Sequence, residues 1–314
     1  MGDIMSRETE KVLKQLMQYL EDHQDELDDG ADENVLAQRS MEGYNDSLRS
    51  KEDADLPQTA DDYMELAEDA GTKKKKREYL SKALELEPDN LDASRMMAEM
   101  DAKRPEDLLD VLSALLEKGN SLMEQEGYFQ DHTGDFWGIL ETRPYMRLRH
   151  SYLEVLIQCG MMGKAAGEAE ELLRLCENDD LGVRYMLMHL YAYLENEDGA
   201  LALHKRYGGY EESQMLLPLA VLYYKKGDRA LSLQYLRRLV KANKDAKRFL
   251  RMMANDDLDG YLDKMSPYGY QPFTIEELIY EYFEDRYLFD SVDFFFDWAH
   301  RSLKGSSSSK TSSK

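Results

Sequence analysis

The feature that most constrains the fold is a helix-to-helix turn that recurs along the second half of the chain. The predicted turns at Gly160, Glu195 and Gly227 are spaced by 35 and 32 residues. A small residue follows each turn by five positions, and these residues are Ala165, Ala200 and Ser232. A period near 34 residues with small residues at helix contacts is typical of tetratricopeptide (TPR) repeats, which stack to bury their apolar faces. The spacing predicts an all-α fold of TPR-like hairpins stacked in a right-handed superhelix, an α-solenoid.

The repeat also predicts how the chain is organised. A first repeat covers residues 60–90, where Gly71 provides the turn and Pro88 stops the second helix. Further hairpins are predicted over residues 142–177, 180–208 and 211–242. The predicted segments are an acidic N-terminal helical arm or cap over 1–59, N-terminal TPR-like helices over 60–135, central TPR-like repeats over 136–255, aromatic C-terminal capping helices over 256–303 and a disordered tail over 304–314.

The first 60 residues differ in composition from the rest. Residues 1–62 contain 18 acidic and 6 basic residues, a net charge of −12. Apolar residues at helical spacing predict an amphipathic helix over residues 7–25, and a weaker helix is predicted over 34–48. We favour a cap on the end of the array, because terminal repeats need a polar outer face. The alternative is a detachable arm that docks on a partner.

Charge and composition exclude several functional classes. The formal net charge of the 314 residues is −23, so the basic footprint of a nucleic-acid-binding protein is missing. We expect no membrane span and no secretion signal, and therefore a cytoplasmic location. Cys159 and Cys176 have no CxxC or HxxxH context, and we interpret both as small buried apolar residues. A disulfide between them is the less favoured alternative.

The TPR register places certain positions of each first helix on a concave groove. The predicted groove residues are Arg147, His150, Glu154 and Gln158 from the first central hairpin, Tyr185, His189 and Tyr193 from the second, and Gln214, Tyr224 and Lys225 from the third. The same register adds Asp61, Glu65, Glu68 and Asp69 from the first repeat. One end of the groove is thus predicted to be acidic and the other basic and aromatic. A guanidinium holds a carboxylate with two parallel hydrogen bonds, so the basic end suits an acidic peptide or a terminal carboxylate.

Arg143, Arg147 and Arg184 form a second candidate site, for a small anionic or phosphorylated ligand. For Arg184, the alternative is a structural role. Arg149 and Arg184 recur 35 residues apart, at equivalent repeat positions, which favours a role in joining adjacent helices.

The sequence contains no motif that predicts catalysis. There is no nucleophile elbow, no phosphate-binding loop and no pair of metal ligands at helical spacing. Ser151 follows His150 directly, but consecutive helical residues point about 100° apart. A hydrolase using His150 or His189 is only a weak alternative. His132 lies between Asp131 and Asp135, but one histidine with loop carboxylates is a poor metal site. We expect no enzyme activity, no metal and no cofactor.

Two segments resemble a known family. FWGILETRPYMR at 136–147 and NDDLGVRY at 178–185 are similar to a block of bacterial TPR proteins related to the suppressor-of-tumorigenicity family, in which ETRPYMR opens one hairpin and NDNxG(I/V)RY opens the next. The resemblance covers most of residues 60–302, including the Gly227 turn and Asn243. Asp180 departs from the family's Asn or Gln-like residue, and the family's proline-rich link after Asn243 is absent. The resemblance implies a TPR fold and no assigned reaction.

These observations predict a non-catalytic scaffold that binds a peptide or a partner protein in the concave groove of residues 142–226. The alternative is a regulatory or accessory protein that binds a small anionic or phosphorylated ligand at the arginines. The partner and the oligomeric state are not predicted.

Overall fold

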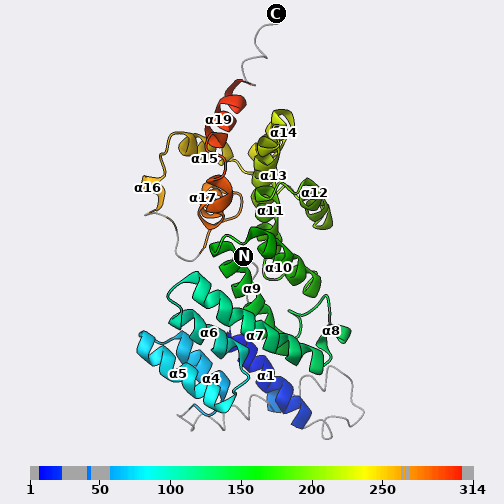
Figure 1. Ribbon diagram of the computed structural model, residues 1–314, viewed down its shortest axis with the longest axis vertical. Helices are drawn as coiled ribbons and strands as arrows, with labels where there is room; N and C mark the ends of the chain where they lie inside the picture. The colour runs from blue at the N-terminus through cyan, green and yellow to red at the C-terminus, as the bar shows by residue number, and fades with distance from the viewer. Residues whose placement is uncertain (1–6, 23–40, 44–56, 263–264, 266–268, 306–314) are drawn as a thin grey trace, which may run out of the picture. The chain divides into compact units, whose positions relative to one another are not determined.

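The computed structural model describes residues 7–22, 41–43, 57–262, 265 and 269–305 (Figure 1). Every regular element of these residues is a helix, so the predicted all-α class is confirmed. No helix of the described part is long and apolar enough to cross a membrane. The helix predicted over 34–48 falls almost wholly outside the described residues, as does nearly all of the predicted disordered tail over 304–314.

The chain divides into two compact units. Unit 1 comprises Met1–Cys159 with Arg174–Leu181, and unit 2 comprises Gly160–Leu173 with Gly182–Lys314. The division passes through the hairpin predicted over residues 142–177. Helical hairpins can therefore be followed within each unit, while the right-handed superhelix of the whole array stays a prediction.

The helices of unit 1 begin at residues that suit helix N-termini. Thr59 and Asp62 form a reciprocal capping box, and Thr72 and Asn90 accept hydrogen bonds from the first turns that follow them. Pro105 occupies the first turn of its helix, where its missing N–H costs nothing. The elements are α1 (Arg7–Asp22), α4 (Ala60–Glu68), α5 (Lys73–Leu86), α6 (Leu91–Asp101), α7 (Pro105–Gln125), α8 (Tyr128–Asp131), the 3₁₀ helix η1 (Leu140–Thr142) and α9 (Arg143–Gln158).

The first predicted repeat is a helical hairpin in the structure. Helices α4 and α5 pack together through Ala67 and Ala83, which are completely buried with Leu80. Small residues at this contact let the two backbones approach closely. Both helices lie within residues 60–90, where the first repeat was predicted.

The block that carries the family resemblance has a structural role in unit 1. Phe136 and Tyr145 are completely buried and lie against Phe129. The backbone N–H of Phe136 donates to the carbonyl of Leu175 at 2.9 Å. Thr142 Oγ1 donates to the carbonyl of Phe136 and, at 3.0 Å, to that of Ile139. These bonds fix the entrance of α9.

Unit 2 contains two complete hairpins and the C-terminal helices (Figure 1). Its elements are α10 (Met162–Leu175, of which residues to Leu173 belong to this unit), α11 (Val183–Tyr193), α12 (Glu197–Arg206), α13 (Ser213–Lys225), α14 (Arg229–Ala242), α15 (Ala246–Ala254), α16 (Asp259–Leu262), α17 (Ile275–Glu284), α18 (Arg286–Phe289) and α19 (Phe295–Gly305).

The predicted repeat turns share one backbone conformation. Gly160, Glu195 and Gly227 have φ values of 71°, 58° and 82°. This left-handed conformation is strained for any residue except glycine, so its presence at Glu195 shows that the hairpin geometry imposes it. Asn196 and Asp228 then cap the following helices. Ala165, Ala200 and Ser232 are completely buried, as the repeat predicted.

The C-terminal helices pack onto the hairpins of unit 2. Helix α18 contacts α11, α17 contacts α13 and α15, and α19 contacts α14 and α15. Asp285 separates α17 from α18. The C-terminal region therefore covers faces of the hairpins of unit 2.

Candidate functional site

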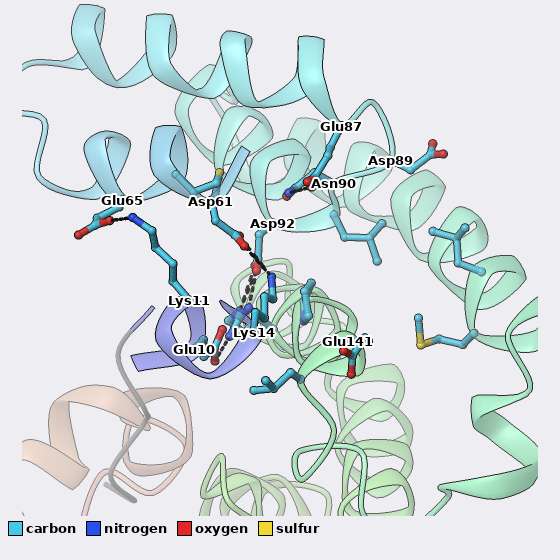
Figure 2. Close-up of a pocket in the computed structure, with 17 residues that line it drawn as sticks. Glu10, Lys11, Lys14, Asp61, Glu65, Glu87, Asp89, Asn90, Asp92 and Glu141 are labelled. Carbon is cyan, nitrogen blue, oxygen red and sulfur yellow. Dashed lines mark hydrogen bonds and ion pairs between the residues drawn. The ribbon is translucent and has the colours of Figure 1, made fainter. Parts of the chain in front are cut away.

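A charged cleft of about 280 Å³ lies in unit 1 (Figure 2). Helices α1, α4, α6 and α9 contribute most of its charged lining. The charged residues that line it are Glu10, Lys11, Lys14, Asp61, Glu65, Glu87, Asp89, Asp92, Glu141 and Arg147. Acidic and basic residues of the first repeat and of α9 thus meet here, with α1 between them.

Arg147 is the centre of the ion pairs in this cleft. Its Nε lies 3.1 Å from both carboxylate oxygens of Asp92, and Nη2 donates to Asp92 Oδ2. Nη1 donates to Glu10 Oε1 at 2.8 Å. Burial alone lowers the pKa of Arg147, but the charges of Asp92 and Glu10 outweigh it and raise the pKa. Arg147 is therefore a fixed cation that binds two carboxylates.

Arg143 completes the binding of the Glu10 carboxylate. Its Nη1 lies 3.3 Å from Glu10 Oε1, and its Nε donates to the carbonyl of Trp137 at 2.8 Å. The Trp137 ring lies 5.3 Å from the Arg143 guanidinium and 5.9 Å from that of Arg147. Glu10 is itself buried. The arginine pair thus holds a carboxylate of the chain's own α1.

A second set of ion pairs joins α1 to α4. Lys11 Nζ lies 2.7 Å from Glu65, and Lys14 Nζ lies 3.1 Å from Asp61 (Figure 2). Lys11 Nζ also lies 2.8 Å from Asp62. Although burial opposes it, the Lys11 hydrogen bond lowers the pKa of Asp62. Two of the four acidic residues predicted for the groove, Asp61 and Glu65, are therefore engaged by α1. Glu68 and Asp69 are exposed at the end of α4.

The remaining predicted groove residues of α9 lie toward the end of that helix. His150 is half-buried, and its Nδ1 lies 3.7 Å from Glu154 Oε1. Burial and the charge of Arg95 lower the pKa of His150 to about 4, so the ring is neutral at pH 7. Glu154 and Gln158 are exposed. Ser151 Oγ donates to Glu99 at 3.0 Å and not to His150.

In unit 2, His189 lies beneath the C-terminal helices and is not exposed at all. Its Nε2 lies 3.1 Å from Glu281 Oε1, and its Nδ1 lies 2.8 Å from the carbonyl of Tyr185 and 3.5 Å from Asp285. Both ring nitrogens face oxygen acceptors, which suits the doubly protonated imidazolium. Burial lowers the pKa of His189, but Asp285 and Glu281 outweigh it and raise the pKa to about 9.

The C-terminal region also covers predicted groove residues on α11 and α13. The ring of Tyr193 lies 5.6 Å from that of Tyr287, and Gln214 Nε2 donates to Tyr270 at 2.7 Å. The Tyr224 ring packs on Phe295 and Trp298 at 5.2 and 5.1 Å.

Tyr185 and Lys225 make hydrogen bonds that join the α11 hairpin to the α13 hairpin. Tyr185 donates to Glu212 at 3.2 Å. Lys225 Nζ donates to the carbonyls of Tyr193 and Ala192. The Arg184 guanidinium lies 4.3 Å from the Tyr185 ring and 5.4 Å from the Tyr207 ring.

The buried carboxylates of α17 were missed by the sequence analysis. Glu277 and Glu281 are buried, and Glu277 accepts hydrogen bonds from Ser213 at 3.0 Å and from the Phe273 N–H at 2.7 Å. Asn243 Nδ2 donates to Ser213 at 3.2 Å. Glu277, Glu281 and Asp285 are spaced by four residues in an apolar, aromatic helix. That spacing places acids on the helix's buried face and was the signal available.

The two thiols have different surroundings. Both are free; Cys176 is buried, as predicted, and its Sγ donates to Asp180 at 3.2 Å. The prediction that Cys159 is buried was wrong, because it is the C-terminal cap of α9 and is only half-buried.

The described helices define an all-α protein built from TPR-like helical hairpins. No family model matches the chain, and no curated protein matches it. Among solved structures, the crystal structure of MamA protein is similar to this chain with a TM-score of 0.41 and 14% sequence identity, covering 60% of this chain and 93% of MamA. None of these comparisons matches the chain to the suppressor-of-tumorigenicity family that the sequence resembles.

Proposed function

We propose that this chain is a non-catalytic protein-interaction scaffold whose hairpins bind a peptide or helix of a partner protein. The observation that carries the proposal is the binding of Glu10 by Arg143 and Arg147. A helical segment with a carboxylate is thus held on a hairpin of this chain by charge-assisted hydrogen bonds. An acidic helix or peptide of a partner would use the same chemistry.

In unit 1 the proposed partner would bind along α9, and in unit 2 along α11 and α13, the helices that carry the predicted groove residues. On α9 it would meet Glu154 and Gln158, which are both exposed. A partner that reaches Arg147 competes with α1. A partner that reaches His189 competes with α17 and α18, so affinity for that part of the groove is reduced by the cost of moving them.

Affinity capture with the full chain tests this proposal. Arg147→Glu reverses the charge that binds the acidic segment, and Arg104→Glu is the matched control because Arg104 is exposed and pairs only locally with Asp107. We expect the amount of captured partner to fall at least about tenfold with Arg147→Glu and to stay unchanged with Arg104→Glu. Because Arg147→Glu also removes buried ion pairs, Gln158→Arg at an exposed position gives a second test. If both Arg147→Glu and Gln158→Arg capture the partner as well as the unaltered chain does, the proposal that the partner binds in the groove is wrong.

A small anionic or phosphorylated ligand at Arg143 and Arg147 is the second candidate; the third arginine predicted for this site, Arg184, belongs to unit 2. The second candidate is favoured by the same bound carboxylate, since the Arg143 and Arg147 pair is built to hold an anion. Such a ligand must displace Glu10, so we expect saturable thermal stabilisation by phosphate or citrate to be stronger in Glu10→Gln than in the unaltered chain. Absence of stabilisation in both proteins rules out this candidate.

A further inference from the structure

Unit 2 contains a second, separate cavity of about 470 Å³, and its lining is basic. Helices α15 and α19 form its walls and pack on each other. The Phe249 and Phe296 rings meet edge to face at 5.8 Å, and Ala246 and Ala299 are completely buried, which fixes the two helices together. The lining residues are Lys244, Lys247, Arg248, Leu250, Arg251, His300, Leu303 and Lys304.

The charge of this cavity contrasts with that of the chain. Five of the eight lining residues are Lys or Arg and none is acidic, although the chain's net charge is −23. The nearby Asp297 of α19 pairs with Arg301, one turn along the same helix. Burial, with the charges of Lys304 and Arg251, lowers the pKa of His300. The lowered pKa of His300 agrees with a positive electrostatic potential in the cavity.

The arrangement of the cations favours an extended ligand over a small anion. Lys247, Arg248 and Arg251 lie within about one turn of α15 and are exposed, while His300 and Lys304 are one turn apart on α19. Small anions are bound by donors that converge on one point. Here the cations Lys247, Arg248 and Arg251 lie along α15, and Lys304 lies on α19. An extended peptide advances about 3.3 Å per residue, so alternate carboxylates fall about 7 Å apart and can follow such a row.

We propose that this basic cavity is a docking site for an extended Asp- and Glu-rich segment of a partner protein. The site is independent of the groove of residues 142–226. The acidic surface elsewhere does not prevent binding, because charges beyond about 8 Å are largely screened at physiological salt. Within the cavity the ion pairs form over short distances. The ligand's backbone would lie between α15 and α19.

Fluorescence anisotropy with the full chain tests the site. The probe is a labelled peptide of about 12 residues with alternating Glu and Ser, and the matched peptide has Gln in place of Glu. We expect saturable binding of the Glu peptide at about 0.15 M salt and none of the Gln peptide. The double variant Lys247→Glu, Arg251→Glu should weaken binding at least about tenfold. Lys73→Glu, Lys74→Glu makes the same charge change at two exposed positions of the basic run that begins α5 and should leave binding unchanged.

Several results would overturn the proposal. Equal losses in the two double variants would show that binding follows net charge alone. Tighter binding of inorganic phosphate or of a single-stranded oligonucleotide than of the Glu peptide would assign the cavity to another anion. Lys244→Glu, at an exposed position before α15, provides a variant outside the helix. If circular dichroism shows that the double variant is unfolded, unchanged binding by Lys244→Glu overturns the site.

Discussion

Nε2 of His189 on α11 lies 3.1 Å from Oε1 of Glu281 on α17, and neither side chain is exposed to solvent. Asp285 lies 3.5 Å from the other ring nitrogen. A buried cation with two carboxylates thus joins the repeat helix α11 to the C-terminal helices. Glu281 Oε2 is buried without a hydrogen-bond partner, and burial raises the pKa of Glu281 to about 7 against the opposing effect of His189. Near neutral pH the folded cluster therefore binds more protons than the unfolded chain.

This cluster predicts that stability falls as the pH rises. The pKa of His189 is about 9 in the folded state and 6.5 unperturbed. Its stabilising contribution is fully present below pH 6.5 and is lost as the pH rises through 9. The raised pKa of Glu281 acts in the same direction. We expect the free energy of unfolding, measured with urea, to fall by about 2 to 3 kcal/mol between these pH values.

His189→Gln should remove most of this slope and lower the stability at pH 6.5. The control is Glu284→Gln, which removes one charge at an exposed position of α17 and should leave the slope in place. A slope that persists in His189→Gln would show that another group is responsible.

The contact of Glu10 with Arg143 and Arg147 predicts how α1 is held. Glu10→Ala leaves each guanidinium with other partners, Asp92 for Arg147 and the Trp137 carbonyl for Arg143. The expected cost is therefore about 1 to 3 kcal/mol, below that of an uncompensated buried charge. Hydrogen exchange of the α1 amides should become faster, while Glu21→Ala, exposed on the same helix, should have no effect. If the α1 amides exchange equally slowly in Glu10→Ala, the other contacts of α1 are enough to hold the helix in place.

Burial and the Asp180 contact predict that Cys176 is unreactive. Burial raises the pKa of its thiol, and the side-chain hydrogen bond to Asp180 adds to this effect. Because the thiolate is the reacting species, alkylation by iodoacetamide at pH 7.5 should be at least about tenfold slower than at the more exposed Cys159. Mass spectrometry of the native protein measures both rates, and denaturation should remove the difference. Equal rates in the native protein would contradict the buried position.

Local features of the fold were predictable because they depend on neighbouring residues. Thr59 and Asn90 mark helix starts, and the spacing of Gly160, Glu195 and Gly227 identified turns that share a left-handed backbone. The conformational preference of glutamate does not predict a left-handed turn at Glu195. Only the repeat spacing indicates that turn.

The sequence did not predict which helices pack over the predicted site residues. The TPR register says which face of α9 or α11 points inward, but not which segment lies against it. Glu10 and Arg147 are 137 residues apart, and His189 and Glu281 are 92 residues apart. Such contacts depend on tertiary packing rather than on helical periodicity. The same arginine and histidine that indicated a ligand site are therefore paired with the chain's own helices.

Two glycines in helices predict opposite effects of one substitution. A Cβ at Gly119 on α7 would lie 2.8 Å from the ring of Tyr145, which is completely buried and cannot move away. Gly119→Ala should therefore destabilise the protein by about 1 to 3 kcal/mol, despite the better helix propensity of alanine. Gly167 on α10 is exposed and has no atom within 4 Å of a Cβ, so Gly167→Ala should stabilise by about 0.5 to 1 kcal/mol. Urea denaturation of the two variants measures both effects. A stabilising Gly119→Ala would show that α7 and α9 are packed less closely than the Gly119 and Tyr145 contact requires.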